Sequence, residues 1–205
     1  MTSKIKVNIL ADGGDNSIIT SDGAGAVTFG TSGDSITIPS GVTITNNGTQ
    51  TGFGGENTPA FKVYLTSAQS IPRSSFTKVQ FNTTSGNNNT GWNVESGFDT
   101  TNYRFTCPSG KSGKYYFSVS LLIEYANVLT EYGIIRWYKN GSAYANFRQG
   151  MNSGGLEYSF TSNTIIDLSD SDYVEVYISQ ESSDSENIDA NSRFTWFEGF
   201  KLIGA

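Results

Sequence analysis

The chain has 205 residues and a formal net charge of −6, with 36% hydrophobic and 13% aromatic residues. The acidic balance disfavours nucleic acid and anionic membrane surfaces as partners, because both bind through clustered basic side chains. The absence of histidine excludes a Ser-His-Asp triad and the usual zinc sites, and the single cysteine excludes an intrachain disulfide. Stability must therefore come from burial within a core or between subunits.

Residues 1–58 contain only two aromatic side chains, Phe29 and Phe53, and are rich in Gly, Ser, Thr, Asn and Asp. Such a segment cannot build a globular core of its own. Its first residues lack an apolar run long enough for a signal peptide, and no run in the chain is long enough to span a bilayer. We therefore expect synthesis in the cytoplasm without signal-directed export, and no membrane insertion.

Two short stretches of this segment, residues 35–38 and 42–45, alternate polar and apolar residues around a turn signal at residues 39–41. One copy of such a hairpin would be unstable in water. Three copies wrapped around an axis would pair the backbone groups of the strand edges and bury the few apolar side chains of each strand. We interpret residues 1–58 as an extended β-rich stalk that ends in a flexible joint at residues 49–57. The alternative is a flexible linker.

Residues 59–205 predict an antiparallel β domain. The clearest strand is 115–123, in which Tyr115, Phe117 and the next three odd-numbered residues fall on one face. Asn140-Gly141 is a strong hairpin signal, because both turn residues need positive φ. Further strands are expected at 61–65, 165–168, 174–178 and 194–202. No stretch has helical periodicity over three turns, and strands at this spacing indicate a sandwich or barrel.

One stretch is more specific than periodicity. It reads FDTTNYRFTCP at residues 98–108, followed by GKYYFS at 113–118. This closely resembles the signature of the C1q/TNF-like superfamily globular head. The segments WYKNG (137–141), IDLSDSDYVEV (166–176) and FEGFKL (197–202) are similar to later strands and turns of that family. The resemblance covers about residues 60–205.

The resemblance implies an all-β jelly-roll sandwich that assembles as a tight trimer. The chain departs from the family pattern at Ser171, where a glycine usually precedes Asp172, and no collagen repeat precedes the head. Cys107 is expected to pack as a small buried hydrophobe, and Gly199 to allow a bulge or close backbone approach. The predicted core signature comprises Phe98, Phe105, Cys107, Tyr115, Phe117, Val174, Val176, Gly199 and Phe200.

Large rings on the outward face of the strand at 172–178 are either scattered surface residues or part of a subunit interface. We favour the interface, and place Tyr173, Tyr177 and Tyr116 in it.

The loop at residues 181–189 carries carboxylates without EF-hand spacing. It is either a solvated loop or a calcium or ligand site near the trimer tip, because some heads of the resembled family hold calcium there. The candidate ligands are Asp184, Glu186 and Asp189. No phosphate loop, metal motif or nucleophile elbow is present, so we expect no enzyme, no catalytic residue and no cofactor other than calcium.

The N-terminal segment is similar to tail-fibre and virion structural proteins of marine bacteriophages, in residues 3–8 and 38–44. These features together predict a homotrimeric bacteriophage fibre protein, of the tail or the head, located in the virion after synthesis in the host cytoplasm. Residues 1–58 would attach to other virion proteins. Residues 59–205 would form a C1q-like head for capsid decoration or for host adhesion, through a surface glycan or protein. The alternatives are a bacterial C1q-like adhesion module outside any phage and a glycan-degrading fibre enzyme.

Overall fold

The computed structural model describes residues 9–11, 17–21, 27–29, 33, 35–43, 45, 57–124, 132–150, 157–182 and 184–203. The chain divides into two compact units, Met1–Thr51 and Gly52–Ala205. Every element in the described ranges is a β-strand. None of these residues forms a helix with the length and apolar character needed to cross a membrane.

The first unit contains an antiparallel sheet of three short strands in the order β1 (Ile9–Ala11), β2 (Ser17–Ser21) and β3 (Val27–Phe29). The predicted strands at 35–38 and 42–45 are wrong: residues 35–43 and 45 carry no strand, and only the turn between them forms. In it, the Val42 N–H donates to the Pro39 carbonyl oxygen. Ile36, Ile38 and Val42 are each 45% or more exposed, so pairing would gain no burial in a single copy. Residues 46–56, including most of the predicted joint, lie outside the described residues.

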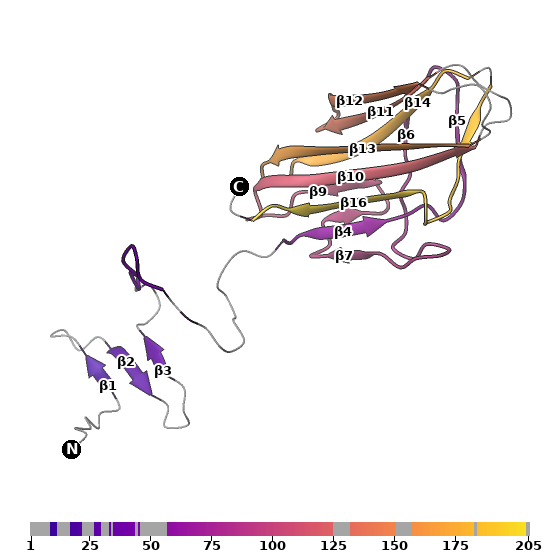
Figure 1. The fold of residues 1–205 in the computed structure, drawn as a ribbon. Coiled ribbons are helices and arrows are strands. Elements are labelled where there is room, and N and C mark those ends of the chain that lie inside the picture. The colour runs from indigo at the N-terminus through magenta and orange to yellow at the C-terminus, as the bar shows by residue number, and fades with distance from the viewer. Residues whose placement is uncertain are drawn as a thin grey trace. The chain divides into compact units, whose positions relative to one another are not determined.

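The second unit is a sandwich of two antiparallel sheets (Figure 1). In the seven-stranded sheet, the short strand β15 (Glu186–Ile188) pairs with the C-terminal end of β10, and β5 (Gln69–Ile71) pairs with β15. The other five strands lie side by side in the order β13 (Glu157–Leu168), β10 (Gly113–Glu124), β16 (Trp196–Lys201), β4 (Ala60–Val63) and β7 (Trp92–Val94).

The six-stranded sheet faces it. Its strand order is β12 (Ser142–Gly150), β11 (Tyr132–Lys139), β14 (Tyr173–Gln180), β9 (Arg104–Thr106) and β8 (Phe98–Asp99), with β6 (Thr77–Lys78) also paired to β14. The predicted hairpin at Asn140 and Gly141 is confirmed: it joins β11 to β12 in two residues, with φ of +51° and +74°.

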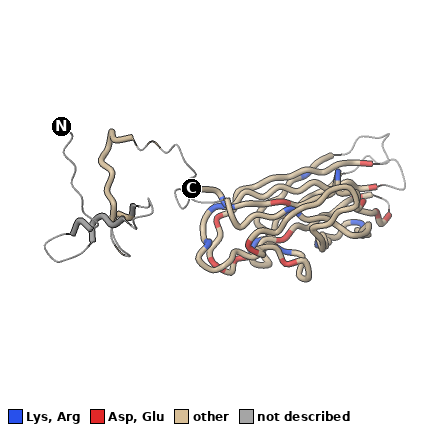
Figure 2. Tube along the Cα trace, turned by 90° about the horizontal axis from the view of Figure 1, so that it is seen from below, with Lys and Arg blue, Asp and Glu red and all other residues tan. Residues whose placement is uncertain are grey.

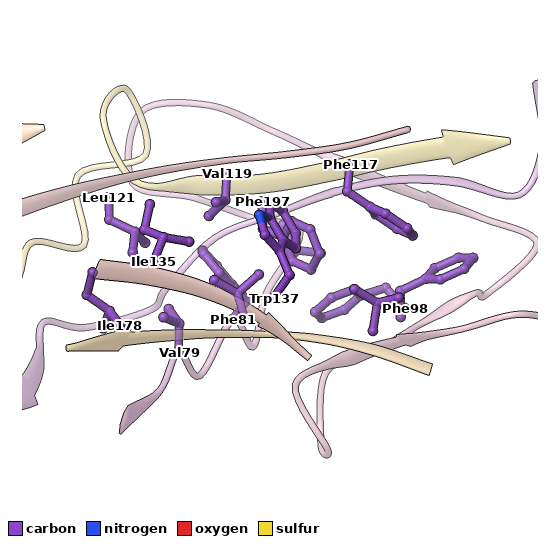
Figure 3. Close-up of a cluster of buried hydrophobic side chains, with 14 of the residues drawn as sticks. Val79, Phe81, Phe98, Phe117, Val119, Leu121, Ile135, Trp137, Ile178 and Phe197 are labelled. Atoms are coloured by element: carbon purple, nitrogen blue, oxygen red, sulfur yellow. The ribbon is translucent and has the colours of Figure 1, made fainter. Parts of the chain in front are cut away.

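Aromatic side chains from both sheets fill the space between them (Figure 3). Phe117 of β10 and Phe197 of β16 meet Trp137 of β11 at ring-centroid distances of 6.2 and 5.7 Å. The Trp137 indole N–H donates to the Ser162 hydroxyl at 2.9 Å, which satisfies the one polar atom of this ring. The alternation predicted for residues 115–123 is confirmed on its core side, since all five odd-numbered residues are completely buried.

Two of the segments that resemble family motifs, residues 137–141 and 166–176, come together at one turn. Asp172 accepts hydrogen bonds from the Asn140 side-chain amide at 2.7 Å and from the Ser169 N–H at 2.9 Å, and pairs with Lys139 at 2.9 Å. These partners, the Asn140 amide first, lower the pKa of Asp172 to about 2. Ser171, just before it, has φ of +70°. A glycine at this position would adopt that conformation without steric cost, which explains the glycine expected there from the resemblance.

Candidate functional site

An apolar row crosses the outward face of the seven-stranded sheet. It takes one residue from each of five neighbouring strands: Ile165 (β13), Tyr116 (β10), Phe200 (β16), Ala60 (β4) and Val94 (β7). The Tyr116 and Phe200 rings lie 5.4 Å apart. Ile165 and Val94, at the two ends of the row, are 54% and 43% exposed. A continuous apolar surface of this kind is typical of an association site.

A cavity of about 320 Å³ adjoins this row at Ala60 and Phe200, toward its β7 end, and its walls also include Phe61 and Trp92. Trp92 is 48% exposed, although it is one of the largest apolar side chains of the domain. At the other end of the row, Ile165 projects from the edge strand β13. The row therefore carries a hollow on one side of the sheet and a projecting apolar side chain on the other.

Phe200 was predicted in the core, and this prediction is wrong. Side chains alternate along β16, so Phe197 and Gly199 face the core whereas Phe200 faces outward and is half-buried. The sequence reads WFEGF at residues 196–200, with aromatic side chains at both even and odd positions. The sequence alone therefore does not show which of them face the core. The remaining eight residues of the predicted core signature are buried: Phe98, Phe105, Cys107, Tyr115, Phe117, Val174, Val176 and Gly199.

The three tyrosines predicted at the interface lie on two different faces. Tyr116 belongs to the apolar row, whereas Tyr173 and Tyr177 lie on β14, on the outward face of the six-stranded sheet. Both have intrachain partners there: the Arg104 guanidinium lies 4.3 Å from the Tyr173 ring, and the Tyr138 ring lies 4.3 Å from that of Tyr177. Burial, and then the nearby Glu175 carboxylate, raise the pKa of Tyr177. Interface roles for Tyr173 and Tyr177 stay predictions.

The three carboxylates predicted to bind calcium do not form a cluster. Asp184 is exposed, Glu186 of β15 is buried, and Asp189 accepts a hydrogen bond from the Asn191 N–H at 2.9 Å. Within the described ranges, no three acidic, histidine or cysteine side chains are grouped as metal ligands. Calcium binding by this loop stays a prediction, which melting curves in calcium and in a chelator would test.

A second cavity, of about 260 Å³, was not predicted from the sequence. We call it the polar cavity. Its lining combines Lys62, two indoles and the hydroxyl and amide groups of two loops. These residues come from three segments, 62–64, 89–92 and 192–196, so sequence spacing does not connect them. The run SGNNNTGW at residues 85–92 is the one sequence feature that could have indicated a polar binding site, because it places three asparagines close to a tryptophan.

The sequence model of the C1q domain family matches residues 60–202, which is more than two thirds of the chain. The chain belongs to the C1q domain family. The jelly-roll fold predicted from the sequence is thereby confirmed. C1q domains and their TNF-like relatives are commonly trimeric binding modules and are typically non-enzymatic.

One solved structure that resembles this C1q domain is that of murine APRIL at pH 5.0. It is 14% identical, with a TM-score of 0.49, and the match covers 70% of this chain and 98% of that chain. The search of curated proteins gave no match. The similarity of the N-terminal segment to phage fibre proteins stays a prediction.

Proposed function

We propose that the chain is the subunit of a homotrimer in which the C1q domain is a non-enzymatic binding head, and that this trimer is a bacteriophage fibre protein. The apolar row is the observation that carries the trimer. It exposes isoleucine, valine and aromatic side chains in one line across five strands. Full burial of an exposed side chain of this kind gains about 1.5–3 kcal/mol. The members of the row are already partly buried, so each gains only part of this amount in a contact.

The two ends of the apolar row differ in shape, as the contact surfaces of a cyclic trimer do. A three-fold assembly joins two different surface patches, because each subunit meets its neighbours head to tail. The Ile165 edge of one copy projects, and the cavity at Ala60 and Phe200 of the next copy offers a hollow of matching apolar character. An assembly of this type buries more than about 2,000 Å², in the range of obligate interfaces.

The N-terminal unit supports the fibre part of the proposal. Its exposed Ile36, Ile38 and Val42 would be covered if three copies ran along a common axis. Residues 1–58 would then form the stalk and attach to other virion proteins. Three equivalent heads on one stalk bind a repetitive host surface by avidity, so each site can be weak.

Replacing Ile165 with glutamate is expected to convert the trimer into monomers. A charge buried at the contact without a partner costs about 3 kcal/mol or more, or more than about a hundredfold in the association constant. Sedimentation velocity at micromolar concentration measures the result. The matched control is Tyr144→Glu, at a 50% exposed ring of β12 in the other sheet, and this variant should remain trimeric. A monomeric wild type, or a trimeric Ile165→Glu variant, would contradict the assignment.

Immunogold labelling tests the fibre itself. Antibodies against residues 59–205 should decorate the tail or the capsid of purified phage particles in electron micrographs. Label found only on bacterial surfaces would replace the phage proposal with the alternative of a bacterial adhesion module. That outcome would leave the trimer untouched, since sedimentation tests it separately.

A further inference from the structure

The polar cavity is a built site on the outward face of the seven-stranded sheet. Lys62 of β4 lies directly opposite Trp92 of β7 in the sheet register, so the cation and the indole share one surface. Trp196, the first residue of β16, adds a second indole, and the Lys62 ammonium lies 4.3 Å from the centroid of that ring. The loops at 85–91 and 189–195 supply the remaining walls.

Ser192 holds the two loops together before any ligand arrives. Its hydroxyl accepts hydrogen bonds from the backbone N–H groups of Asn88 and Asn89 at 2.9 and 3.0 Å. The Asn89 side-chain amide donates to the Ser192 carbonyl oxygen at 3.0 Å, and the Ser192 N–H donates to the Asn87 side-chain oxygen at 2.9 Å. A polar wall fixed in this way loses little conformational freedom when it binds a ligand.

Two glycines allow the loop at 85–91 to approach its neighbours closely. A Cβ atom at Gly91 would stand 2.0 Å from the Lys62 carbonyl oxygen, and one at Gly86 would stand 2.3 Å from the Ser192 Cβ. Neither distance is compatible with a side chain. The depth and the shape of the polar cavity therefore depend on glycine at both positions.

The chemistry of the lining matches a sugar ring. The carbon-bound hydrogens of a pyranose form an apolar face that packs on an indole, and Trp92, which is 48% exposed, offers such a surface beside the Lys62–Trp196 pair. Sugar hydroxyls need partners at the ring edge, and the exposed side chains of Asn89 and Thr90 carry both donors and acceptors. A cavity of about 260 Å³ suits one sugar residue of a longer chain.

The charged residues in the lining of the polar cavity favour an acidic sugar over a neutral one. Basic and acidic residues are interspersed over the whole domain (Figure 2), but the walls of the polar cavity include Lys62 and Arg193 and no carboxylate. Glu198 neutralises Lys62 from outside the lining, at 2.7 Å. None of the ion pairs between described residues includes Arg193, which is exposed. Its guanidinium is available to a carboxylate, the group that it binds best.

We propose that the polar cavity binds a saccharide residue that bears a carboxylate, such as a uronic or sialic acid in a host-surface polysaccharide. The sugar ring packs on Trp92, its hydroxyls bond to the side chains of Asn89 and Thr90, and its carboxylate pairs with Arg193. This inference rests on the proposed role as a binding head and names the ligand class of that head. It does not depend on a phage context.

Intrinsic fluorescence provides the test, because two of the three tryptophans line the polar cavity and the third, Trp137, is 1% exposed in the core. Trigalacturonate and N-acetylneuraminate are the probes, and maltotriose is the neutral control. We expect a saturable change with at least one acidic probe at concentrations below about 10 mM, and binding at least about tenfold weaker for maltotriose.

Arg193→Ala should weaken binding of the acidic probe about tenfold or more, because it removes a charge-assisted hydrogen bond. Arg148→Ala is the matched control, at an exposed arginine of β12 in the other sheet, and should bind as the wild type does. No saturable change with either acidic probe, equal affinity for maltotriose, or unchanged affinity of Arg193→Ala would each overturn the proposal. Sedimentation of the same samples reports the trimer independently, so loss of sugar binding is distinguished from loss of assembly.

Discussion

Phe117→Ala is expected to lower the free energy of unfolding by about 3–5 kcal/mol. Phe117 is completely buried at the centre of β10. Its ring contacts aromatic rings from both sheets, at centroid distances between 5.5 and 6.2 Å: Phe61, Phe105, Tyr115, Trp137 and Phe197. Truncation removes the transfer energy of the ring and leaves a cavity that the rigid sheets on both sides cannot close.

Thermal and urea unfolding measure the loss, at one fixed protein concentration because assembly contributes to stability. Each kcal/mol shifts the melting temperature by about 2–4 °C in a domain of this size. The matched control is Phe194→Ala, at a 46% exposed ring outside the core, which should change stability by less than about 0.5 kcal/mol. We also expect Phe117→Ala to yield no soluble trimer. Equal melting of the two variants would remove Phe117 from the centre of the core.

The sandwich could be predicted because its sequence signals are local. Alternation at residues 115–123 identifies the core side of β10 directly, since side chains of a strand alternate between two faces. Asn140 and Gly141 predict their hairpin through the positive φ that both adopt. The position of Ser171, where the resembled family has glycine, likewise coincides with a positive φ.

The sites could not be predicted to the same degree, because they depend on strand order. Tyr116 and Tyr177 each occupy an outward position in a strand, but no local pattern shows that β10 and β14 belong to opposite sheets. The polar cavity forms because β4 pairs with both β16 and β7, which brings Lys62 beside segments about 30 and 130 residues away. The strands predicted at residues 35–38 and 42–45 are wrong although their local pattern is typical of strands. A single copy of the chain offers no surface that could bury their apolar side chains.

Gly199→Ala is expected to destabilise the domain by about 1–3 kcal/mol, although it adds a single methyl group. Gly199 lies in β16 opposite Phe117 of β10. A Cβ atom there would stand 2.5 Å from Phe117 Cδ1 and 2.9 Å from Phe61 Cε1. Both rings are confined by the aromatic core, so neither can move away without disturbing further contacts.

A double-mutant cycle separates this clash from a general effect of alanine in a strand. Phe117→Val removes Cδ1 and Cε1, the two atoms of Phe117 nearest to the new methyl group. Gly199→Ala should therefore cost less in the Phe117→Val background, with a coupling energy of about 0.5–3 kcal/mol. Gly150→Ala serves as the control, because its Cβ would meet no atom of the described structure within 4 Å and it lies in strand β12. Additive costs in the cycle, or equal costs for Gly199→Ala and Gly150→Ala, would show that the close approach of β16 to the Phe117 ring does not set the requirement for glycine at position 199.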